Sequence, residues 1–421
     1  MSDGLLVVRG GRRLAGRIAV DGNKNAALPL LAACVLTPDT CELRNVPQIR
    51  DVAVMIALLR SLGATVEGEG TSTLRVTCTD ITSGAPDPAL VGRLRGSVML
   101  MGALVARVGW ASLAPPGGDF PARRTITTHL KALGALGAHV TEGASGHRLD
   151  ASSGLQGASM YLLEASVTGT ETALLAAAAA DGVTEIRHAA CEPHVVELCQ
   201  FLGAMGVEVD GAGTSTLRVT GTKTRRGATH TLRGDYIEAA SWGVVGAVTG
   251  SELTITGCHA VDLEPTTAVL AEMGLSFDLS DDGFVVRRSQ LRAAKRVTTG
   301  LWPAFPSDIV SLVTVLATQA EGRTLLHDWM YELRLFALEQ LSAMGADLFL
   351  CDSHRIIVTG PSRLRGRVLD SRDIRSGMAL VAAALVADGE SRVLEIETVE
   401  RGYADLVNRL TALGADVERM E

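Results

Sequence analysis

The chain has 421 residues and a formal net charge of −8, with 47% hydrophobic and 20% charged residues. This composition is typical of a globular protein and excludes a disordered chain. The acidic balance argues against nucleic-acid binding through a broad basic surface, although a few converging arginines still suit a small anion.

Cysteines and apolar runs narrow the class of protein further. The seven cysteines are scattered without a CxxC pair, which predicts neither a disulfide framework nor a zinc site and favours a reducing compartment. The longest apolar run, residues 378–387, is too short to span a bilayer, and the first residues lack the pattern of a signal peptide. We therefore expect a cytoplasmic protein that does not enter a membrane.

Six copies of one local pattern divide the chain into repeats of about 70 residues. In each copy an amphipathic helical stretch ends at Leu or Met followed by Gly, and a strand of alternating polarity comes next. We expect each glycine just past a helix end, in the left-handed conformation: Gly63, Gly137, Gly206, Gly274, Gly345 and Gly414. The octapeptide GTSTLRVT also occurs twice, at residues 70–77 and 213–220. The repeats predict an α/β (α+β) protein with three repeats in each of two domains, residues 22–233 and residues 1–21 with 234–421.

The first candidate site lies in DGNKNAALPLLAA, where Lys24 stands between Asn23 and Asn25 before an apolar helix. A lysine beside the free N–H groups of a helix amino terminus is suited to bind an anion. The alternative is an asparagine that caps the helix next to a solvated lysine.

The second candidate is the segment PPGGDFPARR, residues 115–124. Arg95 is a further candidate, because it lies in an apolar helical stretch where arginine needs a partner. Residues 115–124 are expected to form a mobile loop that lacks helix or strand preference. In this loop Asp119 is a candidate proton donor, and Arg123 and Arg124 are candidate ligands of a phosphate or carboxylate. The alternative is an aspartate in a turn and two solvated arginines.

The last candidates lie in the second half of the chain. Ser307 or Asp308 suits the N-cap of the following helix, and Asp308 is alternatively a general base. Asp373 and Arg375 stand at the start of another apolar helix, and Arg401 precedes a tyrosine by two residues. Charged residues at several helix starts indicate a cleft for a multiply charged substrate.

Residues 5–420 resemble the family of UDP-N-acetylglucosamine enolpyruvyl transferases. The motifs that carry the resemblance are GNKNAALPLLAA, LRGSVMLMGALVAR, PPGGD, EASVTGTE, CEPHVVELCQFL, AFPSD, DIRSGMALVAAALVADG and ERGY. The resemblance implies a two-domain fold in which each domain has three repeats of helices and a four-stranded sheet around a pseudo-threefold axis. This arrangement is an inside-out α/β barrel, and the active site is expected in the interdomain cleft.

The resemblance also implies roles for individual residues, without a metal or an organic cofactor. The phosphoenolpyruvate ligands are expected to be Lys24, Arg95, Arg124, Arg334, Arg375 and Arg401. The catalytic residues are expected to be Asp308 as the base, Asp119 or Lys24 as the acid that protonates C3, and Asp373 near the reacting carbons. The acceptor is expected to meet Asn25, Arg124, Thr125, Thr127, Ser166, Val167, Thr168, Asp308, Met330 and Tyr331.

The sequence departs from the family pattern on the acceptor side. Asp119 replaces the cysteine that fosfomycin alkylates in many members, so we expect insensitivity to fosfomycin. The Pro and Asp that normally follow the loop arginine, of which the Asp reads uracil, are here Thr125 and Thr127. Residues 166–172 and 331–335 also differ from the usual motifs.

We therefore expect transfer of the enolpyruvyl group, with release of phosphate through a tetrahedral ketal, to the 3′-hydroxyl of UMP, as in nucleoside antibiotic biosynthesis. The 3-hydroxyl of UDP-N-acetylglucosamine, as in peptidoglycan synthesis, is the alternative acceptor. A non-catalytic nucleotide-binding paralogue is a further alternative, and the oligomeric state is left open.

Overall fold

The computed structural model describes residues 4–117, 125–143, 145–332 and 334–420. The chain forms two compact units, which we describe separately. Of the described residues, the N-terminal unit contains 22–117 and 125–232, and the C-terminal unit contains 4–21 and 233–420.

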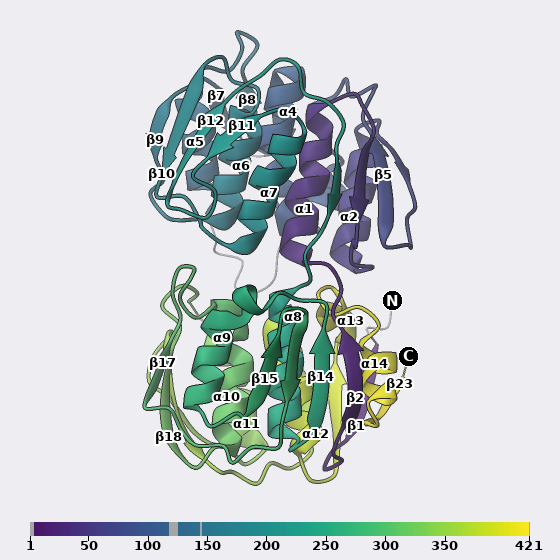
Figure 1. The fold of residues 1–421 in the computed structure, drawn as a ribbon, viewed down its shortest axis with the longest axis vertical. Helices are drawn as coiled ribbons and strands as arrows, with labels where there is room; N and C mark the ends of the chain where they lie inside the picture. The colour runs from purple at the N-terminus through teal and green to yellow at the C-terminus, as the bar shows by residue number, and fades with distance from the viewer. Residues whose placement is uncertain (1–3, 118–124, 144, 333, 421) are drawn as a thin grey trace. The chain divides into compact units, whose positions relative to one another are not determined.

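Apolar helices form the interior of the N-terminal unit, and sheets lie outside them (Figure 1). Three of these helices are largely buried because apolar residues surround their axes: α1 (Lys24–Ala33), α4 (Leu100–Val108) and α6 (Val167–Ala177). The other helices are α2 (Arg50–Ser61), α3 (Pro88–Val91), α5 (Thr127–Ala135) and α7 (Pro193–Ala204), with the 3₁₀ turns η1 (Cys34–Leu36) and η2 (Arg95–Met99).

Three sheets surround these helices. The first, in spatial order, is β13 (Thr229–Thr231), β3 (Cys41–Arg44), β5 (Thr73–Thr77) and β4 (Thr65–Glu67). The second is β6 (Trp110–Leu113), β8 (Gly146–Asp150) and β7 (His139–Gly143). The third is β11 (Glu208–Asp210), β12 (Thr216–Thr220), β10 (Val183–Arg187) and β9 (Ser159–Tyr161).

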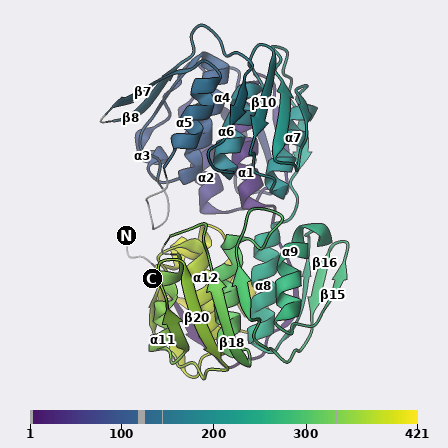
Figure 2. The same ribbon diagram turned by 90° about the vertical axis from the view of Figure 1, so that its left-hand side faces the viewer.

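The C-terminal unit repeats this plan with a more completely buried centre. All residues of α8 (Tyr236–Val248) are buried, as are nearly all of α10 (Val310–Gln319) and α12 (Ile374–Val386). In Figure 2, β15 and β16 lie to one side of α8. The remaining helices are α9 (Ala260–Glu272), α11 (Gln340–Ala343), α13 (Ile396–Glu400) and α14 (Leu406–Ala412), with the 3₁₀ turns η3 (Ser307–Ile309) and η4 (Arg334–Glu339).

Its three sheets each have four strands. The first is β15 (Phe277–Ser280), β16 (Gly283–Val286), β14 (Glu252–Thr256) and β2 (Ala15–Ala19). The second is β17 (Arg296–Thr298), β18 (Gly322–His327), β20 (Arg355–Gly360) and β19 (Asp347–Leu350). The third is β21 (Val368–Asp370), β22 (Glu390–Leu394), β1 (Leu5–Arg9) and β23 (Asp416–Met420), so the first strand of the chain pairs with the last.

The four-stranded sheets share one topology, in which a parallel edge strand is followed by two antiparallel pairings. This confirms the predicted mixed α/β architecture of repeats. The expectation of four strands in every repeat is wrong for the sheet of β6, β8 and β7, which has three in the described part of the chain. An irregular segment occupies the place of the fourth strand, where the carbonyl of Gly84 accepts a hydrogen bond from the N–H of Ser112 at 2.8 Å.

The repeat signals in the sequence correspond to repeated local structure. All six predicted glycines follow a helix with φ between 84° and 104°, which confirms the left-handed conformation. The two copies of GTSTLRVT form corresponding strands in two sheets, β5 and β12. In both turns a threonine hydroxyl, that of Thr71 or Thr214, bonds the carbonyl of the glycine three residues earlier.

Candidate active site

A carboxylate held by two arginines stands at the start of α10. Asp308 Oδ1 accepts a hydrogen bond from Nη1 of Arg334 at 3.1 Å, and Oδ2 accepts one from Nε of Arg375 at 3.2 Å. The Asp308 side chain is 28% exposed, whereas both arginine side chains are less than 10% exposed. The carboxylate is thus accessible at the edge of a buried cationic pair, a suitable place for a general base next to an anion.

Asp308 does not cap the helix, which corrects the capping alternative. The side chains of Ser307 and Asp308 bond other side chains, and the N-cap positions of η3 and α10 are Pro306 and Ile309. The two bonds to guanidinium groups join charged partners, which makes them stronger than bonds between neutral groups, so the arginines retain the carboxylate.

The side chain of Arg375, at the start of α12, is held by two partners, Asp308 and Tyr403. Its Nη1 donates to the Tyr403 hydroxyl at 3.2 Å, and that hydroxyl lies 2.8 Å from Oγ of Ser241. Burial opposes the charge of Arg375, but Tyr403 and Asp308 outweigh it and raise its pKa above the ordinary value. Burial also raises the pKa of Tyr403, so this hydroxyl stays protonated at neutral pH.

Arg334 lies between a turn and an aromatic ring. Its Nη1 donates to Oγ of Ser307 at 2.7 Å, and its guanidinium carbon lies 4.2 Å from the centre of the Tyr331 ring. Burial opposes its charge and Asp308 favours it, with a net rise of the pKa of Arg334. The contact with Tyr331 joins two residues that the sequence analysis assigned to different substrates.

Two more predicted residues of the C-terminal unit have defined places. Asp373 is the N-cap of α12, and its Oδ1 accepts the N–H groups of Arg375 and Ser376, both at 2.9 Å. Arg401 is half-buried and follows α13, two residues before the buried Tyr403. Met330 donates its N–H to the buried carboxylate of Asp328 at 3.2 Å.

In the N-terminal unit, Lys24 begins α1 and is buried. Asn23 caps the helix by accepting the N–H groups of Asn25 and Ala26, which confirms the capping part of the alternative interpretation. Lys24 Nζ lies 2.8 Å from Oδ2 of Asp51, and both side chains are almost fully buried. The alternative of a solvated lysine is therefore wrong.

Except for Asn25 on α1, the described acceptor-side residues of this unit lie at or just before the starts of α5 and α6, and the predicted phosphoenolpyruvate ligand Arg95 contacts one of them. Arg95, at the start of η2, donates to the carbonyl of Thr125 at 3.0 Å. Nε2 of His129 lies 2.9 Å from Oγ1 of Thr168, and Ser166 is the N-cap of α6. Burial lowers the pKa of His129 to about 4, and the charge of Arg95 adds to this effect. Thr127 and Val167 are the first residues of α5 and α6.

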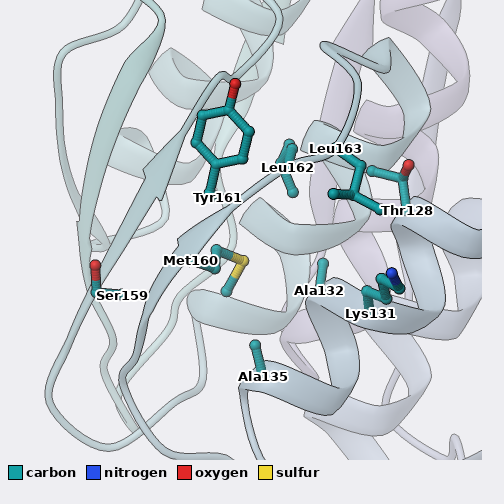
Figure 3. Close-up of a pocket in the computed structure, with 9 residues that line it drawn as sticks. All are labelled: Thr128, Lys131, Ala132, Ala135, Ser159, Met160, Tyr161, Leu162 and Leu163. Carbon is teal, nitrogen blue, oxygen red and sulfur yellow. The ribbon is translucent and has the colours of Figure 1, made fainter.

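A hollow of about 220 Å³ lies beside these residues (Figure 3). One wall is the face of α5 with Thr128 and Lys131, and the other is formed by β9 and the two leucines that follow it. Thr128 Oγ1 also donates to Oε1 of Glu164 at 3.1 Å, which places a carboxylate two residues before the N-cap of α6. The hollow is smaller than the roughly 300–1,000 Å³ of pockets for drug-sized ligands.

Some predictions lie outside the described residues. Asp119, Arg123 and Arg124 belong to the segment 118–124 and receive no structural account. The remaining predicted residues fall into two sets, one in each unit, and in the C-terminal unit both Arg334 and Arg375 contact Asp308.

Sequence reasoning missed three buried groups that support the predicted ones: Asp51, Asp328 and Ser241. Asp51 opens an apolar helical stretch, and Asp328 ends the apolar strand TLLH, so a charge where burial is expected was the available signal for both. Ser241 gave no signal, because a serine in a buried helix is common.

Within the described ranges, no helix is both long and apolar enough to cross a membrane. The seven cysteines, all of which are described, have free thiols.

Comparison with known proteins gives concordant results. The family model of EPSP synthase (3-phosphoshikimate 1-carboxyvinyltransferase) matches residues 8–410. The UDP-N-acetylglucosamine 1-carboxyvinyltransferase of Bradyrhizobium diazoefficiens is 42% identical over 98% of this chain and 97% of its own length. The enzyme of the same name from Borreliella burgdorferi is 38% identical over 99% of both chains.

Solved structures have the same fold. The enolpyruvyl transferase NikO from Streptomyces tendae superposes with a TM-score of 0.91 and 26% identity, covering 100% of this chain and 99% of its own. EPSP synthase from Acinetobacter baumannii has a TM-score of 0.76 at 18% identity, covers 99% of this chain and 100% of its own, and supports the fold alone.

Proposed function

The chain belongs to the family of EPSP synthase and UDP-N-acetylglucosamine 1-carboxyvinyltransferase, and we propose that it transfers the enolpyruvyl group of phosphoenolpyruvate to a secondary hydroxyl of a uridine nucleotide. Enolpyruvyl transfer is the reaction of its relatives and of its structural neighbour NikO.

The contact of Asp308 with Arg334 and Arg375 carries the proposal. Phosphoenolpyruvate has a phosphate and a carboxylate, and it needs several fixed cations for binding. Buried arginines supply such charges without reorganisation during the reaction. A partly exposed carboxylate between them is well placed to accept the proton of a hydroxyl that attacks next to the bound anion.

The proposed reaction is an addition followed by an elimination. Asp308 takes the proton of the acceptor hydroxyl while the oxygen of that hydroxyl forms a bond to C2 of phosphoenolpyruvate. An acid, Asp119 or Lys24, protonates C3. The bond from C2 to the phosphate oxygen of the resulting ketal then breaks as C3 loses a proton, which gives phosphate and the enol ether. Lys24, Arg95, Arg124, Arg334, Arg375 and Arg401 are proposed to bind the charged groups of phosphoenolpyruvate.

We favour the 3′-hydroxyl of UMP as the acceptor. The amino terminus of a helix such as α6 attracts an anion, but Glu164 places a carboxylate near it through its bond to Thr128. A nearby negative charge opposes a diphosphate more strongly than a single phosphate. Thr125 and Thr127 also lack the carboxylate with which the family reads uracil. Asn25, Ser166, Val167, Thr168, Met330 and Tyr331 complete the proposed acceptor contacts.

UDP-N-acetylglucosamine is the second candidate acceptor, because the curated relatives with 38–42% identity are named for it. The 26% identity with NikO is lower, although NikO covers the whole chain.

The test is an assay of phosphate release from phosphoenolpyruvate with either UMP or UDP-N-acetylglucosamine, with the product identified by mass. A carboxyvinyl adduct on UMP alone supports the favoured acceptor, and an adduct on the UDP-sugar alone replaces it with the second candidate. Tight nucleotide binding without either product favours the non-catalytic alternative. Glu164→Gln, with Glu185→Gln as an exposed control on β10, should raise the use of the diphosphate substrate if Glu164 discriminates against it.

A further inference from the structure

Asp328 is a fully buried carboxylate that follows β18. Its Oδ1 accepts hydrogen bonds from Oγ1 of Thr299 at 2.8 Å and from the N–H of Met330 at 3.2 Å. Its Oδ2 accepts a bond from Oγ of Ser307 at 2.7 Å. A buried charge is costly unless several donors compensate it, and these three bonds supply that compensation.

The backbone around this carboxylate is fixed as well. Nδ1 of His354 lies 2.7 Å from the carbonyl oxygen of Asp328, and Nε1 of Trp329 donates to the carbonyl oxygen of Thr299 at 2.7 Å. The bond from Trp329 to Thr299, and the bond from the N–H of Thr299 to the carbonyl oxygen of His327 at 3.0 Å, therefore join the strand end to the segment that bears Thr299 in addition to the carboxylate. Asp328 has little freedom to move away from Ser307.

Asp328 determines the direction of the next hydrogen bonds. A serine hydroxyl has one proton to donate, and Ser307 gives it to Asp328. The lone pairs of Ser307 then face Nη1 of Arg334 at 2.7 Å, and the same nitrogen donates to Asp308 at 3.1 Å. The chain of contacts runs from Asp328 through Ser307 and Arg334 to Asp308, with every donor assigned.

We propose that Asp328 is a positioning residue for enolpyruvyl transfer, which holds Arg334 against Asp308 by accepting the proton of Ser307. This inference rests on the proposed function, in which Arg334 binds phosphoenolpyruvate and Asp308 is the base. Asp328 does not touch the reacting atoms, and it acts on the reaction only through Ser307 and Arg334.

The substitution Asp328→Asn tests the direction of these bonds without changing the shape of the side chain. The amide oxygen must stay where the N–H of Met330 and the hydroxyl of Thr299 donate, so the amide NH₂ faces Ser307. Ser307 then loses its proton acceptor, and its hydroxyl turns away from the arrangement that fixes Arg334.

We expect the KM for phosphoenolpyruvate to rise about 10- to 100-fold, the range expected for losing a hydrogen bond to a charged group. We also expect the acidic limb of the pH profile of kcat to move to higher pH, because a loosened Arg334 stabilises the ionised base less. The KM for the acceptor should change much less. A purely structural role for Asp328 would not separate the two KM values in this way.

Three further variants test whether Asp328 acts on Arg334 through Ser307. Ser307→Ala should reproduce the effect on phosphoenolpyruvate, and the double variant with Asp328→Asn should be no worse than the more impaired single variant. Thr299→Val is the matched control, because it removes a donor to the same carboxylate outside the path to Arg334, and its KM for phosphoenolpyruvate should stay within about threefold of wild type.

A wild-type KM and pH profile in Asp328→Asn would overturn the proposal, and so would an equal defect in Thr299→Val. Failure of the proposed function is recognised separately, as absence of phosphate release by the wild-type protein with both acceptors. In that case calorimetric binding of phosphoenolpyruvate to wild type and Asp328→Asn tests the same contact, and equal affinities refute it.

Discussion

His129 is expected to make the N-terminal unit sensitive to acid. This imidazole is 2% exposed, and burial lowers its pKa from 6.5 to about 4. The folded state therefore binds a proton less readily than the unfolded state does. The stability that depends on the neutral ring is complete above about pH 6.5 and is lost as the pH falls toward 4.

The size of the effect follows from this shift. A change from 6.5 to about 4 corresponds to about 3 kcal/mol at the acidic limit, because one unit of pKa is about 1.4 kcal/mol. Between pH 8 and pH 5 about 2 kcal/mol of this should be lost. For a unit of about 200 residues, that loss lowers the melting temperature by about 4–8 °C.

The assay compares thermal unfolding of the wild-type chain and of His129→Gln between pH 8 and pH 5. Glutamine keeps a polar group for Thr168 but does not titrate. Between pH 8 and pH 5 the melting temperature of the variant should therefore fall by about 4–8 °C less than that of the wild type. Hydrogen exchange of α5 and α6 at each pH locates the difference in the N-terminal unit. Parallel pH dependence in the two proteins would refute the reasoning, and His139→Gln, on β7, serves as the control for a histidine at the surface.

Three other predictions concern the charged residues. Asp308→Asn should lower kcat by about 10²- to 10⁴-fold with a smaller change in the KM for phosphoenolpyruvate, as steady-state phosphate release would show, and near-normal turnover would remove Asp308 as the base. Asp51→Asn should lower the free energy of unfolding in urea by about 3–5 kcal/mol, because it removes the buried negative partner of Lys24. The double variant Lys24→Met with Asp51→Leu removes both charges and should lower the free energy of unfolding much less. Wild-type activity should resist fosfomycin, and Asp119→Cys should become inactivated with a mass increase of one inhibitor molecule; inhibition of the wild type would contradict the assignment of this position.

The parts of the fold that depend on local chemistry were predictable. A glycine is needed wherever a helix ends in a residue of positive φ, so Gly63 and its five counterparts mark the repeats in the sequence itself. The cap by Asn23 is equally local, since it joins residues within one turn. The irregular segment at Gly84, which replaces a fourth strand, was not predictable, because its pairing with Ser112 depends on tertiary packing.

The sequence predicts which charged side chains belong to the site, but it does not predict which side chains they contact. A buried lysine needs a carboxylate, but nothing near Lys24 in the sequence identifies Asp51, which lies at the start of another helix. Asp328 likewise meets Ser307 only because a strand end and a turn are packed together. The sequence therefore indicated which residues carry charge, and the tertiary structure determined which of those charges are neutralised.

The difference among three aspartates explains why one of them suits the role of base. The buried helices α8, α10 and α12 each have an aspartate at or near their start: Asp235, Asp308 and Asp373. Asp235 and Asp373 accept backbone N–H groups of their own helices, which commits a carboxylate oxygen to the cap. Before α10 the 3₁₀ turn η3 intervenes, so the N-cap position falls on Ile309, and Asp308 bonds two guanidinium groups. A carboxylate held by side chains, and partly exposed, can exchange a proton without unwinding a helix end. The turn that disrupts the expected cap is thus what makes Asp308 available for chemistry.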